Sequence, residues 1–190
     1  MPVLSFDEMR RAMVVSQLRP EGVTDARVLD AMGKVPRENY VPDERRATAY
    51  ADRLIPIDGG RGINPPIVTG RLLNEAQLDD DDQVLIIGSA SGYLAAVVSM
   101  LTKSVTLADA GAAIDGCYDA IIIDGAVERI PDDLATHLTP DGRLVAGIVD
   151  GGVTRLAIGR RSGTGFALIP FMDAEMIVLP EFARPTAFVF

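Results

Sequence analysis

The sequence predicts an α/β fold: a mainly parallel sheet that ends in an antiparallel hairpin, with a helical cap at the N-terminus. Three observations predict it. Residues 84–87 form an apolar run that is followed by small residues and then by a helical pattern, which is typical of a buried parallel strand. Residues 118–125 contain a second such run, Ala-Ile-Ile-Ile, between two aspartates. From residue 153 onward, two apolar segments joined by Ser-Gly-Thr-Gly indicate a β-hairpin.

Residues 1–190 are expected to form one domain, in which residues 1–66 are a helical cap and a loop and residues 67–190 are the α/β core. Ser5 and Glu8 have the spacing of a capping box, so a helix is expected to begin after Ser5. Thr24 or Asp25 caps the next helix. The expected helices cover residues 6–18, 26–35, 43–51, 67–78, 93–102 and 131–138.

Composition excludes several classes of partner. The net charge of −9 and the aromatic content of 5%, without Trp, disfavour a nucleic-acid surface. No stretch reaches the roughly 20 apolar residues of a membrane span, and the N-terminus lacks a secretory leader pattern. The single cysteine fits a reducing cytoplasm. We therefore expect a cytoplasmic protein without nucleic-acid or membrane partners, and the oligomeric state stays open.

Two groups of polar residues have plain structural interpretations. Cys117 and His137, each the only residue of its type, are expected to be a core thiol and a surface histidine rather than a catalytic pair. The acidic run at residues 79–82 is expected to solvate a turn and not to bind a metal. Among the candidate sites, the sequence thus favours none that depends on a metal.

The turn at residues 88–92, Gly-Ser-Ala-Ser-Gly, is the first candidate site. Small residues let a ligand approach the backbone, and the helix that follows offers unpaired N–H groups and a positive dipole end. Asp109 ends the next strand, residues 104–108, at the spacing of the acid that holds a ribose in nucleotide-binding α/β folds. The alternatives are a turn without a ligand and a polar residue at a strand end.

Two segments depart from a regular α/β pattern. Residues 52–66 hold several Gly and Pro residues, and such a loop is either functional or a plain connector. Residues 110–117 join two strands that flank a third, and they are too few for a crossover helix. The connection can close only if it is nearly extended or contains one helical turn. Further strands are expected after the Pro-Asp-Gly turn at residues 140–142, at residues 176–179 and at residues 186–190.

A set of short motifs occurs in a fixed order in the first 60 residues. The motifs are Gln17-Leu18, Val28-Leu29, Ala31-Met32, Val35 to Glu38, Val41-Pro42, Ala49-Tyr50 and Asp52. In these motifs, in the strand at 118–126 and in the Leu-x-Pro-x-Gly-Arg-Leu-Val turn at 138–145, the chain resembles the protein-L-isoaspartate O-methyltransferases. The resemblance implies a Rossmann-like class I methyltransferase fold and S-adenosyl-L-methionine as methyl donor. It also implies methyl transfer to the α-carboxylate of isoaspartyl residues in a damaged protein or peptide, which is a protein-repair reaction.

The same resemblance assigns the donor site. The small-residue turn matches the family's glycine-rich turn, with alanine in place of the middle glycine, and Asp109 matches the acid that binds the ribose. Asp124, at the end of the strand that begins at Tyr118, lies at the same edge of the sheet and could contact donor or substrate or cap the next turn. The residues expected to bind the donor are Gly88, Ser89, Ala90, Gly92, Asp109 and Asp124.

The acceptor loop departs from the family pattern. The family reads Q-T-I-S-Q-P where this chain reads Arg61 to Pro66, and the serine to which an acceptor-orienting role is given is Asn64 here. Asn64 could still donate a hydrogen bond to a carboxylate, and Arg61 could hold one bidentately. Asp52 matches the loop acid that precedes the substrate strand. The residues expected to act in catalysis are therefore Asn64, Asp52 and Arg61.

The family also has a helix and an edge strand between Asp109 and the strand at residue 118. Either this protein lacks that unit and leaves the adenine side of the donor site open, or residues 109 and 110 are not true neighbours. The leading hypothesis is an isoaspartyl-type methyltransferase, with an altered substrate as one form of it. A catalytically silent methyltransferase-like binding protein is the alternative. A nicotinamide-dependent dehydrogenase is disfavoured, because the cap and hairpin fit it poorly and no histidine or Tyr-Lys pair is placed to act as its acid.

Overall fold

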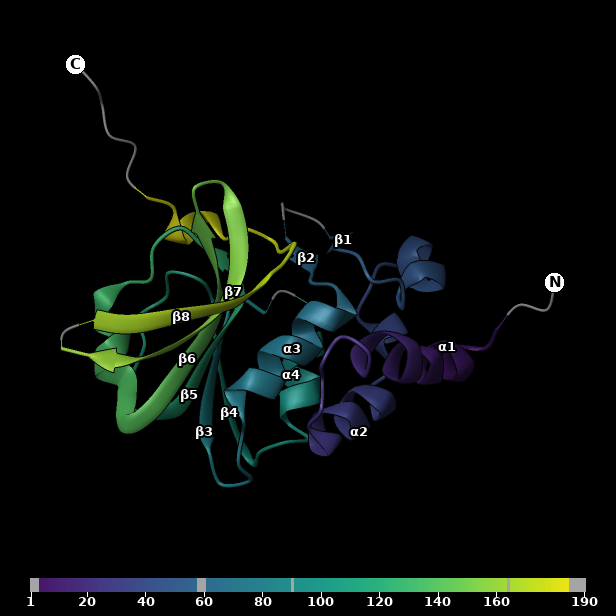
Figure 1. Ribbon diagram of the computed structural model, residues 1–190, viewed down its shortest axis with the longest axis horizontal. Coiled ribbons are helices and arrows are strands. Elements are labelled where there is room, and N and C mark those ends of the chain that lie inside the picture. Colours follow the sequence, from purple (N-terminus) through teal and green to yellow (C-terminus); the bar gives the residue numbers. More distant parts are fainter. Residues whose placement is uncertain (1–3, 58–60, 90, 164, 185–190) are drawn as a thin grey trace, which may run out of the picture.

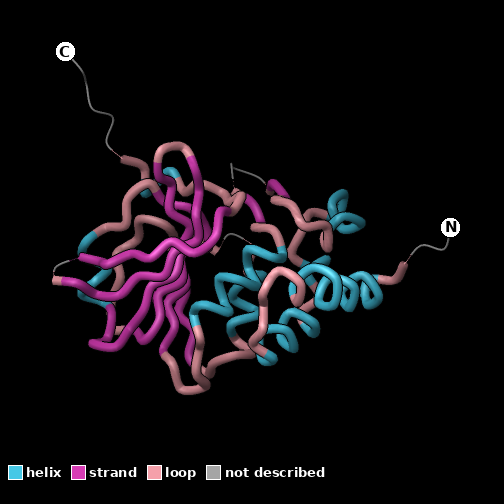
Figure 2. The backbone as a smooth tube through the Cα atoms, viewed as in Figure 1, coloured by secondary structure: helices cyan, strands magenta, loops and turns pink. Residues whose placement is uncertain are grey.

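The computed structural model describes residues 4–57, 61–89, 91–163 and 165–184. Its centre is a six-stranded sheet in the order β4-β3-β5-β6-β7-β8, and the helices α1 to α4 gather on one side of it (Figures 1 and 2). The strands are β3 (Gln83–Ile87), β4 (Ser104–Ala108), β5 (Tyr118–Val127), β6 (Leu138–Asp150), β7 (Val153–Ser162) and β8 (Gly165–Asp173). The helices are α1 (Phe6–Met13), α2 (Ala26–Lys34), α3 (Pro66–Ala76) and α4 (Tyr93–Val98).

The sheet is mixed, as the sequence predicts. β3 pairs in parallel with β4 on one side and with β5 on the other, and β5 pairs in parallel with β6. The last two strands, β7 and β8, are antiparallel and form the expected hairpin. The chain therefore leaves β3 in both directions across the sheet, so the carboxyl end of β3 is a topological switch point.

The N-terminal cap follows the predicted helix pattern with local differences. The capping box of Ser5 and Glu8 is present at the start of α1, and Asp25 caps α2. Residues 14–18 continue α1 as a π-helical turn, η1 (Val14–Leu18). The third helix is a 3-10 helix, η3 (Asp43–Thr48), and a shorter one, η2 (Arg37–Asn39), precedes it. The division of the domain at residue 66 stays a prediction.

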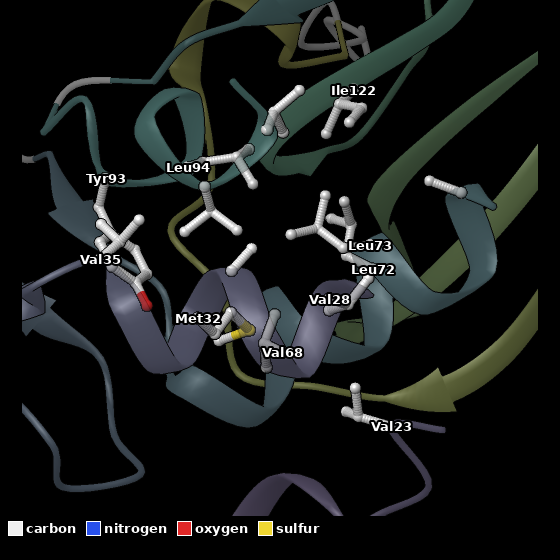
Figure 3. Close-up of a cluster of buried hydrophobic side chains, with 14 of the residues drawn as sticks. Val23, Val28, Met32, Val35, Val68, Leu72, Leu73, Tyr93, Leu94 and Ile122 are labelled. Carbon is white, nitrogen blue, oxygen red and sulfur yellow. The ribbon is translucent and has the colours of Figure 1, made fainter. Parts of the chain in front are cut away.

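Two apolar clusters cover the two faces of the sheet. Successive side chains of a strand alternate between faces, and Ile86 and Ile122 belong to the cluster under the helices while Ile87 and Ile121 belong to the opposite one. The first cluster packs side chains of α2, α3 and α4 onto β5 (Figure 3). Cap and sheet thus share one continuous core.

Several predictions downstream of β5 are corrected. Residues 132–137 form the 3-10 helix η5 (Asp132–His137) and not an α-helix. The Pro-Asp-Gly segment at 140–142 lies inside β6 and not before it. It shifts the register between β5 and β6, because Tyr118 pairs with Leu138 whereas Ala120, two residues later, pairs with Arg143. Residues 176–179 form no strand of the sheet; one parallel bridge joins Val178 to Ala126. The strand expected at 186–190 lies outside the described residues.

The short connection between β4 and β5 closes without a helix, as its length requires. A turn follows Asp109, whose carbonyl accepts a hydrogen bond from the Ala112 N–H at 3.1 Å. Ala110 and Ile114 then pack against the cluster on the face opposite the helices. Cys117 is exposed, so the prediction of a core thiol is wrong: the connection passes over the surface too briefly to cover it.

The acidic run at 79–82 is paired with basic side chains. Asp80 contacts Arg27, Asp81 contacts Lys103, and Asp82 lies 2.6 Å from Arg143. The turn before β3 is therefore tied to α2 and β6 and is not merely solvated. Within the described part of the chain, no helix is both long and apolar enough to cross a membrane.

Candidate functional site

A cleft of about 670 Å³ lies at the carboxyl ends of β3, β4 and β5, which is where open α/β sheets bind ligands. The turn after β3 forms one wall of the cleft, and the ends of β4 and β5 form two others. Arg61 and Gly62 of the cap loop and residues 177–181 near the C-terminus complete the lining. The residues that line it are Arg61, Gly62, Ile86, Gly88, Ser89, Leu107, Ala108, Asp109, Ala110, Asp124, Ile177, Val178, Leu179, Pro180 and Glu181.

Two glycines of the turn adopt a backbone conformation that other residues rarely adopt. Gly88 has a φ of +80° and Gly92 a φ of +76°, a region that favours glycine. Gly92 precedes α4, and the Ser91 hydroxyl accepts a hydrogen bond from the Tyr93 N–H at 3.2 Å. The Ser89 hydroxyl is buried at the cleft and, within the part of the chain that the structure describes, makes no hydrogen bond of good geometry. Ala90, the other predicted member of the turn, lies outside the described residues.

Asp124 lies at the end of the apolar part of β5 and faces the cleft. Its Oδ1 accepts a hydrogen bond from the Asn64 side-chain amide at 2.8 Å. Burial raises the pKa of the Asp124 carboxyl, while the nearby Ser89 hydroxyl, the Asn64 amide and the Arg37 guanidinium oppose that rise. The carboxyl therefore holds a proton more readily than an aspartate in water.

Asn64 is buried and its side chain is engaged at both ends. Besides the bond to Asp124, its Oδ1 accepts a hydrogen bond from the Ile177 N–H at 3.2 Å. It thereby joins the cap loop, β5 and the C-terminal segment. Among the described residues, the cleft lining includes Arg61 and Gly62 of this loop but not Asn64.

Arg37 is a residue of this site that motif reasoning did not single out. It is fully buried, and its Nε donates to the Ala49 carbonyl at 2.7 Å while its Nη2 donates to the Asn64 carbonyl at 2.6 Å. Its guanidinium lies over the Tyr93 ring, 4.8 Å from the ring centroid. Burial lowers the pKa of Arg37. The only sequence signal was its place in the Val-Pro-Arg-Glu motif.

The remaining predicted residues fall into two groups. Arg61 and Asp109 line the cleft. Asp52 does not: its carboxylate is exposed and accepts a hydrogen bond from the Ile67 N–H at 3.0 Å, in the first turn of α3. The structure thus gives Asp52 the position of a helix-capping side chain, at the base of the loop that carries Asn64.

Asp109 also borders a second cavity of about 290 Å³, which lies between the end of β3, the short connection and η5. Apolar side chains line most of it, and Asp133 and His137 add polar groups. His137 Nδ1 lies 2.8 Å from the Gly116 carbonyl oxygen. The apolar lining comes from Ile87, Ala112, Ala113, Ile114, Pro131, Leu134 and Phe182.

Residues 176–182, here called the C-terminal segment, cross the end of β5. The Ala126 N–H donates to the Ile177 carbonyl at 2.6 Å, and the Leu179 N–H donates to the Ala126 carbonyl at 2.8 Å. The Leu179 side chain packs on Gly88 and Gly125, where a Cβ would come within 3.0 Å or less of it. Only its first part, residues 176–179, is predicted to be a strand, and the apolar pattern of that part does not predict its position across the site.

Comparison with known proteins extends this picture. Residues 9–109 match the sequence model of the protein-L-isoaspartate(D-aspartate) O-methyltransferase family. A protein-L-isoaspartate O-methyltransferase of Methylorubrum extorquens is 34% identical, with 94% of this chain and 91% of that protein covered. One from Nitrobacter winogradskyi is 31% identical, with 97% and 99% covered.

Solved structures agree in fold. The chain superposes on a Plasmodium falciparum protein assigned as a protein-L-isoaspartate O-methyltransferase with a TM-score of 0.74, at 17% identity, over 90% of this chain and 98% of that one. That structure was solved with S-adenosyl-L-homocysteine. A second protein-L-isoaspartate O-methyltransferase structure gives a TM-score of 0.73 at 18% identity, over 92% of this chain and 67% of that one.

The relatives are longer than this chain in the aligned region. The Methylorubrum alignment runs over 207 positions and the Nitrobacter alignment over 215, although the whole chain has 190 residues. The match to the family model ends at residue 109, where the short connection begins. Both observations agree with the expectation that the family carries additional residues between β4 and β5.

Proposed function

This chain belongs to the protein-L-isoaspartate O-methyltransferase family, and from that membership we propose how its cleft accommodates donor and acceptor. It is an S-adenosyl-L-methionine-dependent methyltransferase of the isoaspartyl type. The comparisons favour this enzyme over a catalytically silent relative, because the chain covers nearly the whole length of relatives that carry this name.

The buried Ser89 hydroxyl carries the donor proposal. Among the described residues this buried hydroxyl lies near Asp124 but makes no hydrogen bond of good geometry, which is costly unless a ligand completes it. It lies on the glycine turn at a cleft of about 670 Å³. The charges agree: among the described residues, the acids Asp109, Asp124 and Glu181 line the cleft together with the guanidinium of Arg61, so the described lining is acidic even when Asp124 is neutral. S-adenosyl-L-methionine carries a net positive charge and supplies an electrophilic methyl group on its sulfonium sulfur. The lining therefore fits the donor.

We assign the adenine end of the donor to the second cavity. Asp109 lines both cavities, so a carboxylate that holds the ribose would lie between them. The second cavity of about 290 Å³ has the largely apolar walls that an aromatic base requires. Gly111 and Ile114 of the short connection contribute to these walls. In this arrangement the connection encloses the adenine, and the expected open adenine side is closed.

The chemistry of methyl transfer indicates what the acceptor part of the site has to do. A carboxylate attacks the methyl carbon in line with the departing sulfur, so the protein has to position it and exclude water. Arg61 carries the positive charge among the described residues of the cleft lining, and we propose that it binds the acceptor carboxylate. Asn64 and Asp52 then position the loop that carries Arg61, through Asp124 and through the first turn of α3.

Asp109→Ala tests the donor site. A carboxylate that accepts hydrogen bonds from a ligand is worth about 1.5–3 kcal/mol, so S-adenosyl-L-homocysteine affinity should fall roughly tenfold or more by calorimetry. Asp115→Ala is the matched control, because Asp115 is an exposed acid of the same connection that does not line either cavity. Equal affinities for the two variants would reject the ribose role of Asp109.

Methyl transfer to an isoaspartyl peptide tests the activity itself. Incorporation of labelled methyl groups into the isoaspartyl peptide, and not into the aspartyl isomer, is the expected result. Donor binding without transfer to either peptide would contradict the proposed acceptor.

We further propose a role in protein repair in the cytoplasm, which the single, exposed cysteine supports and which cell fractionation would check.

A further inference from the structure

The polar group that the acceptor loop presents to the cleft is not that of Asn64. The amide of Asn64 donates to Asp124, its oxygen accepts from Ile177, and its backbone carbonyl accepts from Arg37. Because Asn64 is buried and held in these three directions, it is poorly placed to turn toward an acceptor. Asp124, at the other end of the 2.8 Å hydrogen bond, does line the cleft.

A carboxyl group in this place has a consequence for a carboxylate acceptor. Two carboxylates that share one site cannot both ionise without a large electrostatic cost. The reaction does not remove this electrostatic cost by a proton transfer. The acceptor oxygen supplies the electron pair of the new O–CH₃ bond, and the electron pair of the S–CH₃ bond goes to sulfur. No proton leaves the acceptor. An ionised Asp124 is therefore not needed as a base and only repels the incoming group.

The surroundings of Asp124 make its neutral form easier to reach than that of an aspartate in water. Burial raises the pKa of the carboxyl, against the Ser89 hydroxyl, the Asn64 amide and the buried Arg37. Arg61 lines the same cleft, as do the carboxylates of Asp109 and Glu181. We assign Arg61 to the acceptor, so the acceptor carboxylate neutralises the charge of Arg61 when it binds. An acceptor carboxylate adds one more negative charge, so its arrival raises the pKa of Asp124 further.

We propose that Asp124 binds the acceptor carboxylate in its protonated form, as a hydrogen-bond donor, so that acceptor binding requires one proton on this residue. The inference rests on the proposed function of the cleft. In this role Asp124 is a specificity-determining residue. At high pH its ionised form repels carboxylate acceptors, and at lower pH its protonated form binds them.

The test is the affinity of an isoaspartyl peptide for the enzyme loaded with S-adenosyl-L-homocysteine, measured by calorimetry between about pH 6 and pH 9. In the wild type, affinity should fall with rising pH by up to tenfold per unit, the slope for one linked proton. Asp124→Asn keeps the shape and an oxygen that can accept from Asn64, and its amide donates at every pH. Its affinity should be independent of pH over this range.

Glu181→Gln is the matched control. It removes a carboxylate from the same cleft at an exposed position, and the wild-type slope should persist. A slope that disappears in both variants would assign the effect to the general charge of the cleft and overturn the inference. A wild-type affinity that does not change with pH, or an unchanged slope in Asp124→Asn, would also overturn it.

Activity measurements separate this inference from the proposed function. A peptide that binds with the predicted pH dependence but is never methylated supports the role of Asp124 and contradicts the function. A peptide that is methylated with the same kcat/KM at all these pH values supports the function and contradicts the role of Asp124. Absence of peptide binding at every pH would contradict both.

Discussion

Ile86, in β3, the second strand from the edge of the sheet, has register partners on both sides: Leu107 of β4 and Ile122 of β5. Ile122 is completely buried, whereas Leu107 is 60% exposed. Side chains of α2, α3 and α4 pack around Ile122 (Figure 3), and β6 pairs with β5 on its far side. In contrast, β4 is the edge of the sheet and leads into the short connection. One side of β3 is thus supported by a full core and the other by a single strand.

Two of the acids that line the cleft follow the same division. Asp124, on the β5 side, is desolvated and hydrogen-bonded by Asn64, and its pKa is raised by burial. Asp109, on the β4 side, is exposed. The difference teaches that similar acids at the ends of neighbouring strands can serve different purposes: one is tuned by its surroundings, and the other is a solvated group available to a ligand.

The largest expected effect tests the difference between the two sides directly. Ile122→Ala should lower the free energy of unfolding by about 2–5 kcal/mol, because it opens a cavity in a closed core. Leu107→Ala should lower it by less than about 1 kcal/mol, because most of that side chain is already in water. Urea unfolding measures both. Similar losses for the two variants would show that the β4 edge is covered in solution.

A second change tests how the cap supports the Asp124 side. Arg37→Met removes the donor of two buried carbonyl groups, those of Ala49 and Asn64, and should cost about 2–4 kcal/mol of unfolding free energy. Arg11→Met is the control, since Arg11 is an exposed arginine of α1. Denaturant midpoints compare the two variants. A loss no larger than that of the control would mean that the guanidinium does not hold the two loops together.

The smallest effect is expected on the β4 side. Cys117→Ser should change the unfolding free energy by less than about 0.5 kcal/mol, because the side chain is exposed on the short connection. The native wild-type protein should also react with one equivalent of an aromatic disulfide reagent without denaturant. A thiol that reacts only after unfolding would show that the connection is covered, for instance by another copy of the chain.

Local sequence patterns determined much of the fold. The capping box at Ser5, the apolar runs of β3 and β5 and the glycine turn each depend on residues that are close together in the chain. Short-range backbone preferences and side-chain periodicity fix such features before any tertiary contact forms. The length of the connection at 110–117 likewise excluded a crossover helix by geometry alone.

Only the tertiary structure decided how the site is assembled. Asn64 meets Asp124 across 60 positions of sequence and Ile177 across 113. Arg37 is buried because the cap folds over it, and Leu179 rests on Gly88 because the C-terminal segment returns across β5. The periodicity of apolar residues along the chain does not predict such contacts, since they depend on which surfaces the packed elements bring together. The sequence by itself thus determined the strands of the sheet, the turn and the two acids. Packing decided that one acid is half-buried beside Asn64 while the other is exposed to water.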